Sequence, residues 1–354
     1  MDLGISFVGS GSATPQKIIK NDQLGQRVDT NDEWIQTRTG IGQRRVIGEN
    51  ESLIDLATDA AMNAVKMADW DVKTIDLIIL ATSTPEDLFG SAPKIQSNLG
   101  ASNAVAFDLT AACSGFLFAL VTASQYLASG SMKRALVIGA DQLSKWVDWD
   151  DRKTCVLFGD GAGAVALESS GDESGLIGYD LKSDGSKGGC LNLSQSNVFL
   201  DLVQGANHQK GEYLPIKMEG KEVYKFAVKE VPIILGEILE KCQIKSESID
   251  WLLLHQANQR ILDAVASRFS IPSEKVLSNL KYYGNTSAAT IPLMLDEAVR
   301  DKRIKSGDLI ACSGFGAGLS WGAALFYWHG PYYCLLYTSP SPRDVEESRM
   351  PSSA

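Results

Sequence analysis

The chain has 354 residues and a mass of 38.2 kDa, enough for two units of ordinary domain size. Its 33 Lys and Arg residues against 43 Asp and Glu residues give a formal net charge of −10, which argues against nucleic acid or an anionic membrane as the main partner. No stretch reaches the roughly 20 apolar residues that cross a bilayer, and residues 1–16 do not resemble a secretory signal. Six cysteines without a C-x-x-C pair argue against a zinc site or a disulfide framework. The composition predicts a soluble protein of a reducing compartment, with no bound metal.

Apolar, β-branched runs alternate along the chain with segments of helical period, the pattern of an α/β fold. Strands are expected at residues 4–9, 77–82, 105–109, 135–140, 163–168, 176–180, 251–255, 276–277, 309–313 and 323–328. Helices are expected at residues 52–67, 92–99, 115–128, 223–242, 259–269 and 286–299.

The two halves of the sequence repeat one another. An Ile-Asp pair precedes an apolar run at Ile75 and again at Ile249, and a further apolar run begins 60 residues later in each half, at Ala135 and at Leu309. Chance similarity between common strand–helix units is the alternative, but the coupled spacings favour an internal duplication. We therefore expect two similar halves, residues 1–172 and 173–329, with the boundary in the acidic, Ser- and Gly-rich stretch at 170–174. Residues 330–354 are aperiodic, are rich in Pro and Ser and resemble vector sequence, so we expect a disordered, non-native tail.

Cys113 is the strongest candidate for a nucleophile. It lies between the expected strand 105–109 and the expected helix 115–128, with small residues on both sides. The free N–H groups and the dipole at a helix N-terminus favour a thiolate, so a lowered pKa is expected. Most cysteines are small buried hydrophobic residues, and this is our interpretation of Cys155, Cys242 and Cys312.

Two further residues have positions suited to catalysis. His255 ends the apolar run 251–254, and active sites in α/β proteins gather at the carboxyl ends of strands. Asn285 follows Gly284 and precedes an expected helix, at the place that Cys113 occupies in the first half. A structural histidine and an N-cap asparagine are the simpler alternatives. The glycine-rich segment 313–319 can form an oxyanion site from backbone N–H groups or a tight turn alone.

Three segments together resemble the active-site signatures of β-ketoacyl-acyl carrier protein synthase III. They are Ala111–Gly115, His255–Asn258 and Gly284–Ala288. Further similarity lies at residues 31–35, 38–41, 152–155, 159–163 and 314–318, and the resemblance runs in order from about residue 4 to residue 328. Residues 84–90 are most similar to the cyanobacterial and plastid branch of the family.

The resemblance implies a thiolase fold, a five-layer αβαβα sandwich of duplicated halves that works as a homodimer. It implies a decarboxylating Claisen condensation of an acyl-CoA primer, usually acetyl-CoA, with malonyl-acyl carrier protein, which starts type II fatty acid synthesis. Cys113 would carry the acyl group, and His255 and Asn285 would donate hydrogen bonds to the malonyl thioester oxygen. The backbone N–H groups of Cys113, Gly316 and Ala317 would form the second oxyanion site. Coenzyme A thioester is a substrate, and no tightly bound cofactor is implied.

The same resemblance assigns residues to substrate binding. Trp34, Arg38 and Arg152 match positions that bind coenzyme A. Leu88 and Phe89 are expected in the acyl pocket. Carrier proteins are acidic, and basic residues on the two helices beside His255 are candidates for docking one. These docking candidates are Lys221, Lys225, Arg260 and Arg268.

Other classes of protein remain as alternatives at this point. A type III polyketide synthase and a cysteine protease also combine Cys, His and Asn, and a non-catalytic scaffold could bind acyl groups or carrier proteins. The expected location is the cytoplasm for a bacterial protein and the plastid stroma for an algal or plant protein.

Overall fold

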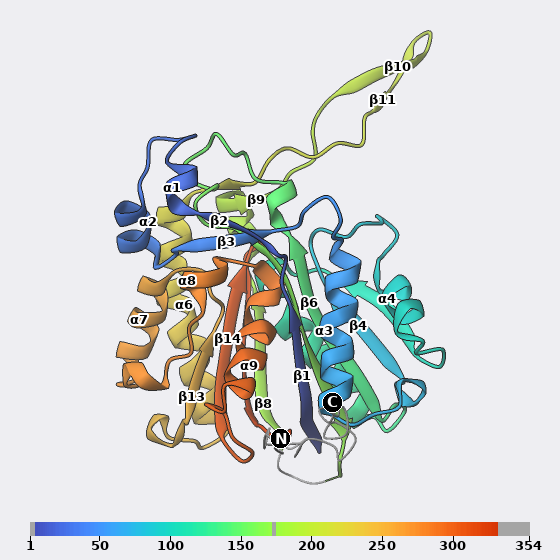
Figure 1. Ribbon diagram of the computed structural model, residues 1–354, viewed down its shortest axis with the longest axis vertical. Coiled ribbons are helices and arrows are strands. Elements are labelled where there is room, and N and C mark those ends of the chain that lie inside the picture. The colour runs from blue at the N-terminus through green and yellow to red at the C-terminus, as the bar shows by residue number, and fades with distance from the viewer. Residues whose placement is uncertain (1–3, 172–174, 332–354) are drawn as a thin grey trace, which may run out of the picture.

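The computed structural model describes residues 4–171 and 175–331, which form two main sheets with helices between them and on both outer faces (Figure 1). The strands are β1 (Ile5–Ala13), β2 (Lys17–Lys20), β3 (Gln43–Val46), β4 (Leu77–Ala81), β5 (Val105–Leu109), β6 (Arg134–Gln142), β7 (Asp160–Ser169), β8 (Leu176–Ser183), β9 (Leu191–Asn192), β10 (Phe199–Val203), β11 (Ala206–Gln209), β12 (Lys217–Met218), β13 (Trp251–Leu254), β14 (Leu309–Gly316) and β15 (Ser320–Tyr327). The α-helices are α1 (Asn21–Leu24), α2 (Asp32–Thr39), α3 (Leu53–Met67), α4 (Ala92–Leu99), α5 (Gly115–Ala128), α6 (Gly220–Lys241), α7 (Gln259–Arg268), α8 (Leu280–Tyr283) and α9 (Thr290–Arg300).

The two main sheets have the same strand order and directions. The first is ordered β1-β7-β6-β4-β5, and the second is ordered β8-β15-β14-β13 when given in the same sense. In each, two long antiparallel pairings are followed by a parallel one, β4 with β6 and β13 with β14. In the first sheet, β5 pairs in parallel with the outer side of β4. At the equivalent place in the second sheet, a single parallel bridge joins Leu252 of β13 to Val276. This repetition confirms the duplication that the spacings predicted.

Three buried clusters show that the fold has five layers, αβαβα, as expected. One cluster packs α3 and α4 against the outer face of the first sheet, and another packs α6 and α7 against the outer face of the second. The third joins both sheets through α5 and α9, which lie between them (Figure 1). Both sheets therefore bury both faces, which is why their strands have continuous apolar sequences.

Glycines allow the middle layer to lie directly on the first sheet. A Cβ atom on Gly139 of β6 would lie 2.2 Å from the carbonyl oxygen of Ala288, and one on Gly163 of β7 would lie 2.5 Å from the backbone nitrogen of Leu293. Because no side chain separates the backbones, the segment that follows Asn285 is held against the carboxyl-terminal part of β6.

The strands of the two main sheets and the helices packed on them agree with the sequence expectations, with two differences. The expected helix 286–299 is a 3₁₀ turn at Ser287–Ala289 followed by α9, and residues 276–277 make a single bridge instead of a strand. The elements outside the two main sheets and their covering helices were not predicted: β2, β3, β9, the hairpin of β10 and β11, β12, and the helices α1, α2 and α8. Helix α2 has no apolar stripe to detect, but Asn31 caps its N-terminus and Gly40 ends it with φ +82°.

Two sequence expectations concern segments that the structure does not describe. The boundary between the halves was placed at 170–174, and residues 172–174 lie outside the described residues, between the end of β7 and the start of β8. The division at 172/173 therefore stays a proposal. Most of the expected tail, residues 332–354, also lies outside the described residues. Within the described part, no helix is long and apolar enough to cross a membrane.

The contact at Gly139 predicts a measurable loss of stability. Gly139→Ala would force its Cβ against the backbone of Ala288, and overpacking of this kind costs about 1–3 kcal/mol of unfolding free energy. Gly189→Ala is the control, because a Cβ there meets no atom within 4 Å. Thermal and urea unfolding of both variants are the measurements. Equal stability of the two variants would contradict the close packing of the middle layer.

Candidate active site

Cys113 lies in a 3₁₀ turn, Ala112–Ser114, between the end of β5 and the first residue of α5. Ala112 has φ +48°, so the backbone turns sharply just before the cysteine. Gly316, at the end of β14, packs against this turn so closely that a Cβ atom would lie 2.6 Å from the backbone nitrogen of Cys113. The turn thus brings the cysteine and the two residues of the expected oxyanion site, Gly316 and Ala317, to one place.

His255 follows β13 directly, as predicted, and its backbone N–H donates to the carbonyl oxygen of Ser313 at 2.9 Å. The ring is buried, 2% exposed, and packs edge-on against Phe315. Its Nδ1 lies 2.7 Å from the hydroxyl of Thr290. The same hydroxyl lies 3.0 Å from the carbonyl oxygen of Ser287, and its single proton can be donated to only one of these two acceptors. In the arrangement in which it donates to Nδ1, the ring proton is on Nε2, the nitrogen that remains free to donate to a substrate.

Asn285 is held by its backbone and by its own side-chain oxygen. Its N–H donates to the carbonyl oxygen of Leu157 at 2.9 Å, and its carbonyl oxygen accepts from Gly159 at 3.0 Å. The side-chain Oδ1 accepts from the backbone N–H of Ser287 at 2.8 Å. With Oδ1 engaged in this way, Nδ2 is the group that can donate into the cavity.

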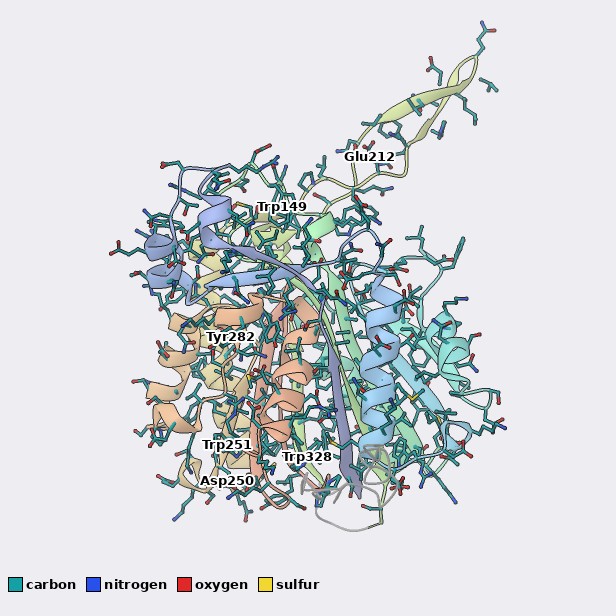
Figure 2. All side chains as sticks on the ribbon, in the orientation of Figure 1. Trp149, Glu212, Asp250, Trp251, Tyr282 and Trp328 are labelled. Carbon is teal, nitrogen blue, oxygen red and sulfur yellow. The ribbon has the colours of Figure 1, made fainter. Side chains whose placement is uncertain are left out.

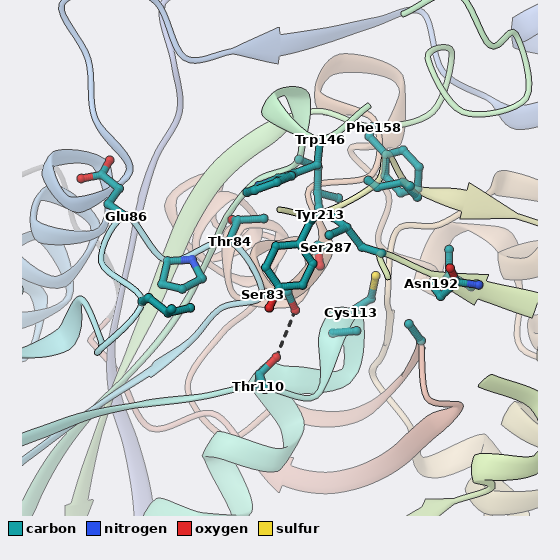
Figure 3. Close-up of a pocket in the computed structure, with 18 residues that line it drawn as sticks. Ser83, Thr84, Glu86, Thr110, Cys113, Trp146, Phe158, Asn192, Tyr213 and Ser287 are labelled. Atoms are coloured by element: carbon teal, nitrogen blue, oxygen red, sulfur yellow. Dashed lines mark hydrogen bonds between the residues drawn. The ribbon is translucent and has the colours of Figure 1, made fainter. Parts of the chain in front are cut away.

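Two cavities of about 470 Å³ each meet at Cys113. The first has a largely apolar lining that includes Leu143, Trp146 and Ile216, and the sulfur of Cys113 points toward its interior beside Ser287 (Figure 3). The second is lined by Cys113, His255 and Asn285 together with several charged residues. A thioester held in the second cavity could therefore pass its acyl group through Cys113 into the first.

The second cavity gathers the residues expected to bind coenzyme A. The guanidinium groups of Arg38 and Arg152 each lie 5.0 Å from the centre of the Trp34 ring, and Arg152 donates to the carbonyl oxygen of Asp29 at 2.6 Å. Lys153, which was not predicted, also lines this cavity. An aromatic ring between guanidinium groups suits the stacking of an adenine and the binding of phosphates.

The four expected docking residues do not lie together. Lys221 and Arg260 line the second cavity, and Arg260 lies 5.3 Å from the centre of the Tyr224 ring. Lys225 forms an ion pair with Glu222 at 2.8 Å. Arg268 lines a separate depression between α6 and α7. Arg260 and Lys221 are therefore the docking candidates closest to the reacting groups.

Leu88 and Phe89 differ in their relation to the apolar cavity. Leu88 lines it but is 80% exposed. Phe89 is 99% exposed and does not line it, so the expectation that Phe89 forms the acyl pocket is not met within a single chain. The backbone N–H of Phe89 donates to Oδ1 of Asp87, two residues earlier in the same loop.

Burial dominates the charge state of the site. Burial raises the pKa of the Cys113 thiol to about 12, and the nearby Asp141 adds to this effect. Hydrogen bonds from Ser287 and from the backbone act in the opposite direction but are weaker. Burial also lowers the pKa of His255 to about 3. The expectation of a lowered pKa and a thiolate is therefore wrong, because the effect of desolvation on the pKa of Cys113 outweighs the effect of the helix N-terminus. Without substrate, the site favours a neutral thiol beside a neutral imidazole.

Three polar residues close to the reacting groups were missed from the sequence. They are Asp141 at the end of β6, Ser287 in the turn after Asn285, and Thr290 at the start of α9. Asp141 had a detectable signal, because it follows an apolar run near the carboxyl end of a strand. Ser287 lies within the segment Gly284–Ala288 that carries the resemblance, although no role was assigned to it, and Thr290 had no signal in the sequence. In the described part of the chain, no group of three or more His, Cys, Asp or Glu side chains could hold a metal ion.

Comparisons with known proteins agree with this geometry. Residues 107–185 match the model for 3-oxoacyl-[acyl-carrier-protein] synthase III, and residues 239–328 match the model for the C-terminal part of that enzyme. The chain is 99% identical over 332 residues to the β-ketoacyl-[acyl-carrier-protein] synthase III of Prochlorococcus marinus strain NATL2A, across 94% of this chain and 98% of the relative. This chain belongs to the 3-oxoacyl-[acyl-carrier-protein] synthase III family.

Solved structures show the same relationship. The 3-oxoacyl-[acyl-carrier-protein] synthase III of Aquifex aeolicus VF5 is 43% identical with a TM-score of 0.84, and the match covers 92% of this chain and all of that one. The enzyme of Thermus thermophilus is 37% identical with the same TM-score and coverage. The fold is therefore the thiolase fold, and the chain is an acyltransferase, a condensing enzyme that initiates fatty acid synthesis. The polyketide synthase, protease and scaffold alternatives are not favoured.

The buried thiol predicts a steep pH dependence of alkylation. Because only the thiolate reacts, the rate of Cys113 modification by iodoacetamide should rise about tenfold per pH unit between about pH 7 and 9. Mass spectrometry of the modified peptide gives the rate, with Cys113→Ala as the blank for the other thiols. An alkylation rate that does not rise with pH above pH 7 would show that the helix N-terminus lowers the pKa of Cys113 more than burial raises it.

Proposed function

We propose that the chain condenses acetyl-CoA with malonyl-acyl carrier protein, releasing carbon dioxide and coenzyme A and forming a 3-oxoacyl-acyl carrier protein. The observation that carries the proposal is the position of Cys113 at the junction of the two cavities. The polar cavity can hold the pantetheine arm of either thioester, and the apolar cavity can hold the acyl chain once it is attached to the cysteine. Coenzyme A thioester acts as a substrate, and no tightly bound cofactor takes part.

In the first half-reaction, Cys113 attacks the acetyl thioester. Trp34, Arg38 and Arg152 would hold the adenine and phosphates at the mouth of the polar cavity. The backbone N–H groups of Cys113, Gly316 and Ala317 would stabilise the oxyanion, and the close approach of Gly316 to Cys113 supports this role. Coenzyme A leaves, and the acetyl group stays on the sulfur.

In the second half-reaction, malonyl-acyl carrier protein occupies the polar cavity and loses carbon dioxide. Negative charge then appears on its thioester oxygen, where Nε2–H of His255 and Nδ2 of Asn285 would donate hydrogen bonds. The lowered pKa of His255 supports this role, because a neutral ring carries one proton. This proton is on Nε2 in the tautomer in which the Thr290 hydroxyl donates to Nδ1 instead of to the carbonyl oxygen of Ser287. The enolate attacks the acetyl group on Cys113.

We also propose that the enzyme is a homodimer paired along β5. This strand forms the edge of the first sheet; Val105 is 54% exposed, and the other four residues of the strand are half-buried. The loop with Leu88 and Phe89 lies next to it, since the backbone N–H of Ser91, two residues after Phe89, donates to Asp108 of β5. An uncovered edge strand beside exposed apolar side chains favours pairing with a second copy.

The β10–β11 hairpin extends beyond the body of the chain and also carries apolar side chains that the chain does not cover. Glu212 lies where this arm joins the body (Figure 2). Phe199, Leu202 and Val203 of the hairpin are 58%, 64% and 65% exposed. A second copy would bury such residues. We place the enzyme in the cytoplasm, because its relatives come from the cyanobacteria Prochlorococcus and Synechococcus.

The two half-reactions should separate on mutation. Cys113→Ala should abolish acetyl transfer and condensation but still decarboxylate malonyl-acyl carrier protein slowly, because both donors to the enolate oxygen remain. His255→Ala and Asn285→Ala should each keep acetyl transfer and lose decarboxylation by about 10²-fold or more. Retention of radiolabelled acetyl and release of carbon dioxide are the two measurements. Loss of acetyl transfer in Asn285→Ala with decarboxylation intact would contradict the role given to Asn285.

Docking of the acidic carrier protein should depend on Arg260 and more weakly on Lys225, which already pairs with Glu222. We expect Arg260→Glu to raise the KM for malonyl-acyl carrier protein about tenfold at low salt and to spare acetyl-CoA, since charges at the rim act through the association rate. Lys229→Glu is the control, because Lys229 pairs with Glu230 beside the separate depression. If Arg260→Glu raised the KM for malonyl-acyl carrier protein and for acetyl-CoA by the same factor, and if this factor did not change with salt concentration, the docking surface would be excluded.

The dimer proposal predicts a mass of twice the 38.2-kDa chain in sedimentation velocity experiments. Val105→Lys combined with Phe89→Asp should weaken this association, because charge replaces apolar contact on the exposed edge. Tyr282→Asp is a control at another exposed aromatic residue, which lies on α8, away from β5. A monomeric wild-type chain at micromolar concentration would overturn the proposal.

A further inference from the structure

We propose that Arg44 is a positioning residue for the second half-reaction. It holds the segment of residues 156–159, to which the backbone of Asn285 is bound, so that Nδ2 of Asn285 can donate to the malonyl thioester oxygen. The inference rests on the proposed function and extends it to a residue that does not touch the substrates, since Arg44 lines neither of the two cavities.

The backbone of residues 156–159 sets the position of Asn285. The N–H of Asn285 donates to the carbonyl oxygen of Leu157, and its carbonyl oxygen accepts from the N–H of Gly159. Phe158 lies between these two residues and forms a parallel bridge with Asn285. The side-chain oxygen of Asn285 bonds within its own turn and gives no hold on another part of the chain. A shift of residues 156–159 would therefore move Asn285 as well.

Arg44, on strand β3 beside α8 (Figure 1), anchors one end of this segment. Its Nη2 donates at 2.8 Å to the carbonyl oxygen of Val156, the first residue of the segment. Its Nη1 donates to Oδ1 of Asn21 at 2.8 Å and to the carbonyl oxygen of Ile19 at 3.2 Å. The guanidinium group thus ties the segment to β2 and to the start of α1.

The aliphatic part of Arg44 packs against the same backbone. A Cβ atom added to Gly159 would lie 3.1 Å from Cβ of Arg44, and one added to Gly284 would lie 3.5 Å from it. Gly284 has φ +66°, and a Cβ atom there would also lie 2.7 Å from the carbonyl oxygen of Leu157. No side chain therefore separates Arg44 from either of the two backbone segments that meet at Asn285.

The burial of Arg44 is unfavourable, and neutral groups alone offset it. The residue is 0% exposed, and its acceptors within residues 4–171 and 175–331 are two backbone carbonyl oxygens and one amide oxygen. Its Nε has no hydrogen-bond partner among the described residues. Burial lowers the pKa of Arg44 to about 10, which leaves the group charged at neutral pH. An apolar side chain of similar volume would avoid the desolvation, so a buried charge here favours a positional role for its hydrogen bonds.

The two half-reactions should depend on Arg44 to different degrees. The turn that carries Cys113 packs against Gly316 of β14, and attack on the acetyl thioester does not use the Asn285 side chain. Stabilisation of the enolate does use it, and a misplacement of about 1 Å can reduce the rate of a catalysed step by up to about 10²-fold. The loss on disturbing Arg44 should therefore fall on decarboxylation.

Two rates test this role, decarboxylation of malonyl-acyl carrier protein and single-turnover acetylation of Cys113 at saturating acetyl-CoA. Arg44→Met removes the donors and keeps a side chain of similar length, so kcat for decarboxylation should fall about tenfold or more, with acetylation within about threefold of wild type. Arg44→Lys should lose about threefold in decarboxylation, because an ammonium group replaces the planar fork. Arg45→Met is the matched control on the same strand, since the Arg45 guanidinium donates to the carbonyl oxygen of Pro15 instead of to residues 156–159.

A double-mutant cycle separates positioning from a general loss of structure. If Arg44 acts through Asn285, Arg44→Met should lower decarboxylation by less than about twofold further in an Asn285→Ala background. Arg44→Lys takes its place in the cycle if Arg44→Met does not fold.

Three results would overturn the proposal. They are a wild-type rate of decarboxylation in the folded Arg44 variant, equal losses in both half-reactions, and the same loss of decarboxylation with and without the Asn285 side chain. A wild-type enzyme that neither becomes acetylated on Cys113 nor decarboxylates malonyl-acyl carrier protein would instead overturn the proposed function, so the two failures are distinguishable.

Discussion

The whole site depends on the close approach of two turns, one from each half of the fold. The turn with Cys113 and the turn that follows Asn285 are equivalent parts of the duplicated halves, and both lie in the middle layer between the sheets. They can meet because Gly139 and Gly316 present no side chain where the backbones touch. A Cβ atom added at either glycine would displace one of the two turns, and so move Cys113 relative to His255 and Asn285.

This packing has an electrostatic consequence. The site lies deep between two sheets, so desolvation raises the pKa of Cys113 and lowers that of His255, and both groups are neutral at rest. Neutral groups suit the chemistry of the family. An imidazole with one proton can donate a hydrogen bond to an enolate, and a thiol releases its proton only when an acyl group is present.

The sequence predicted those features that follow from periodicity and duplication. The two sheets, the helices α3 to α7 and the positions of Cys113, His255 and Asn285 all follow from apolar runs and their spacing. Features that depend on tertiary placement were not predicted. Desolvation raises the pKa of Cys113, the opposite of the lowering expected from its helix terminus. Phe89 is almost fully exposed and does not line the cavity. Helix α2 and the β10–β11 hairpin lack the apolar pattern of elements that pack on a core.

The central claim is that one sulfur atom, at the meeting point of two cavities, carries the acyl group. Intact-protein mass spectrometry after mixing with acetyl-CoA, followed by peptide mapping, tests it most directly. The account predicts one added acetyl group per chain, located on Cys113 and lost when malonyl-acyl carrier protein is then added. Absence of the adduct, or an acetyl group on another cysteine such as Cys155 or Cys312, would contradict it.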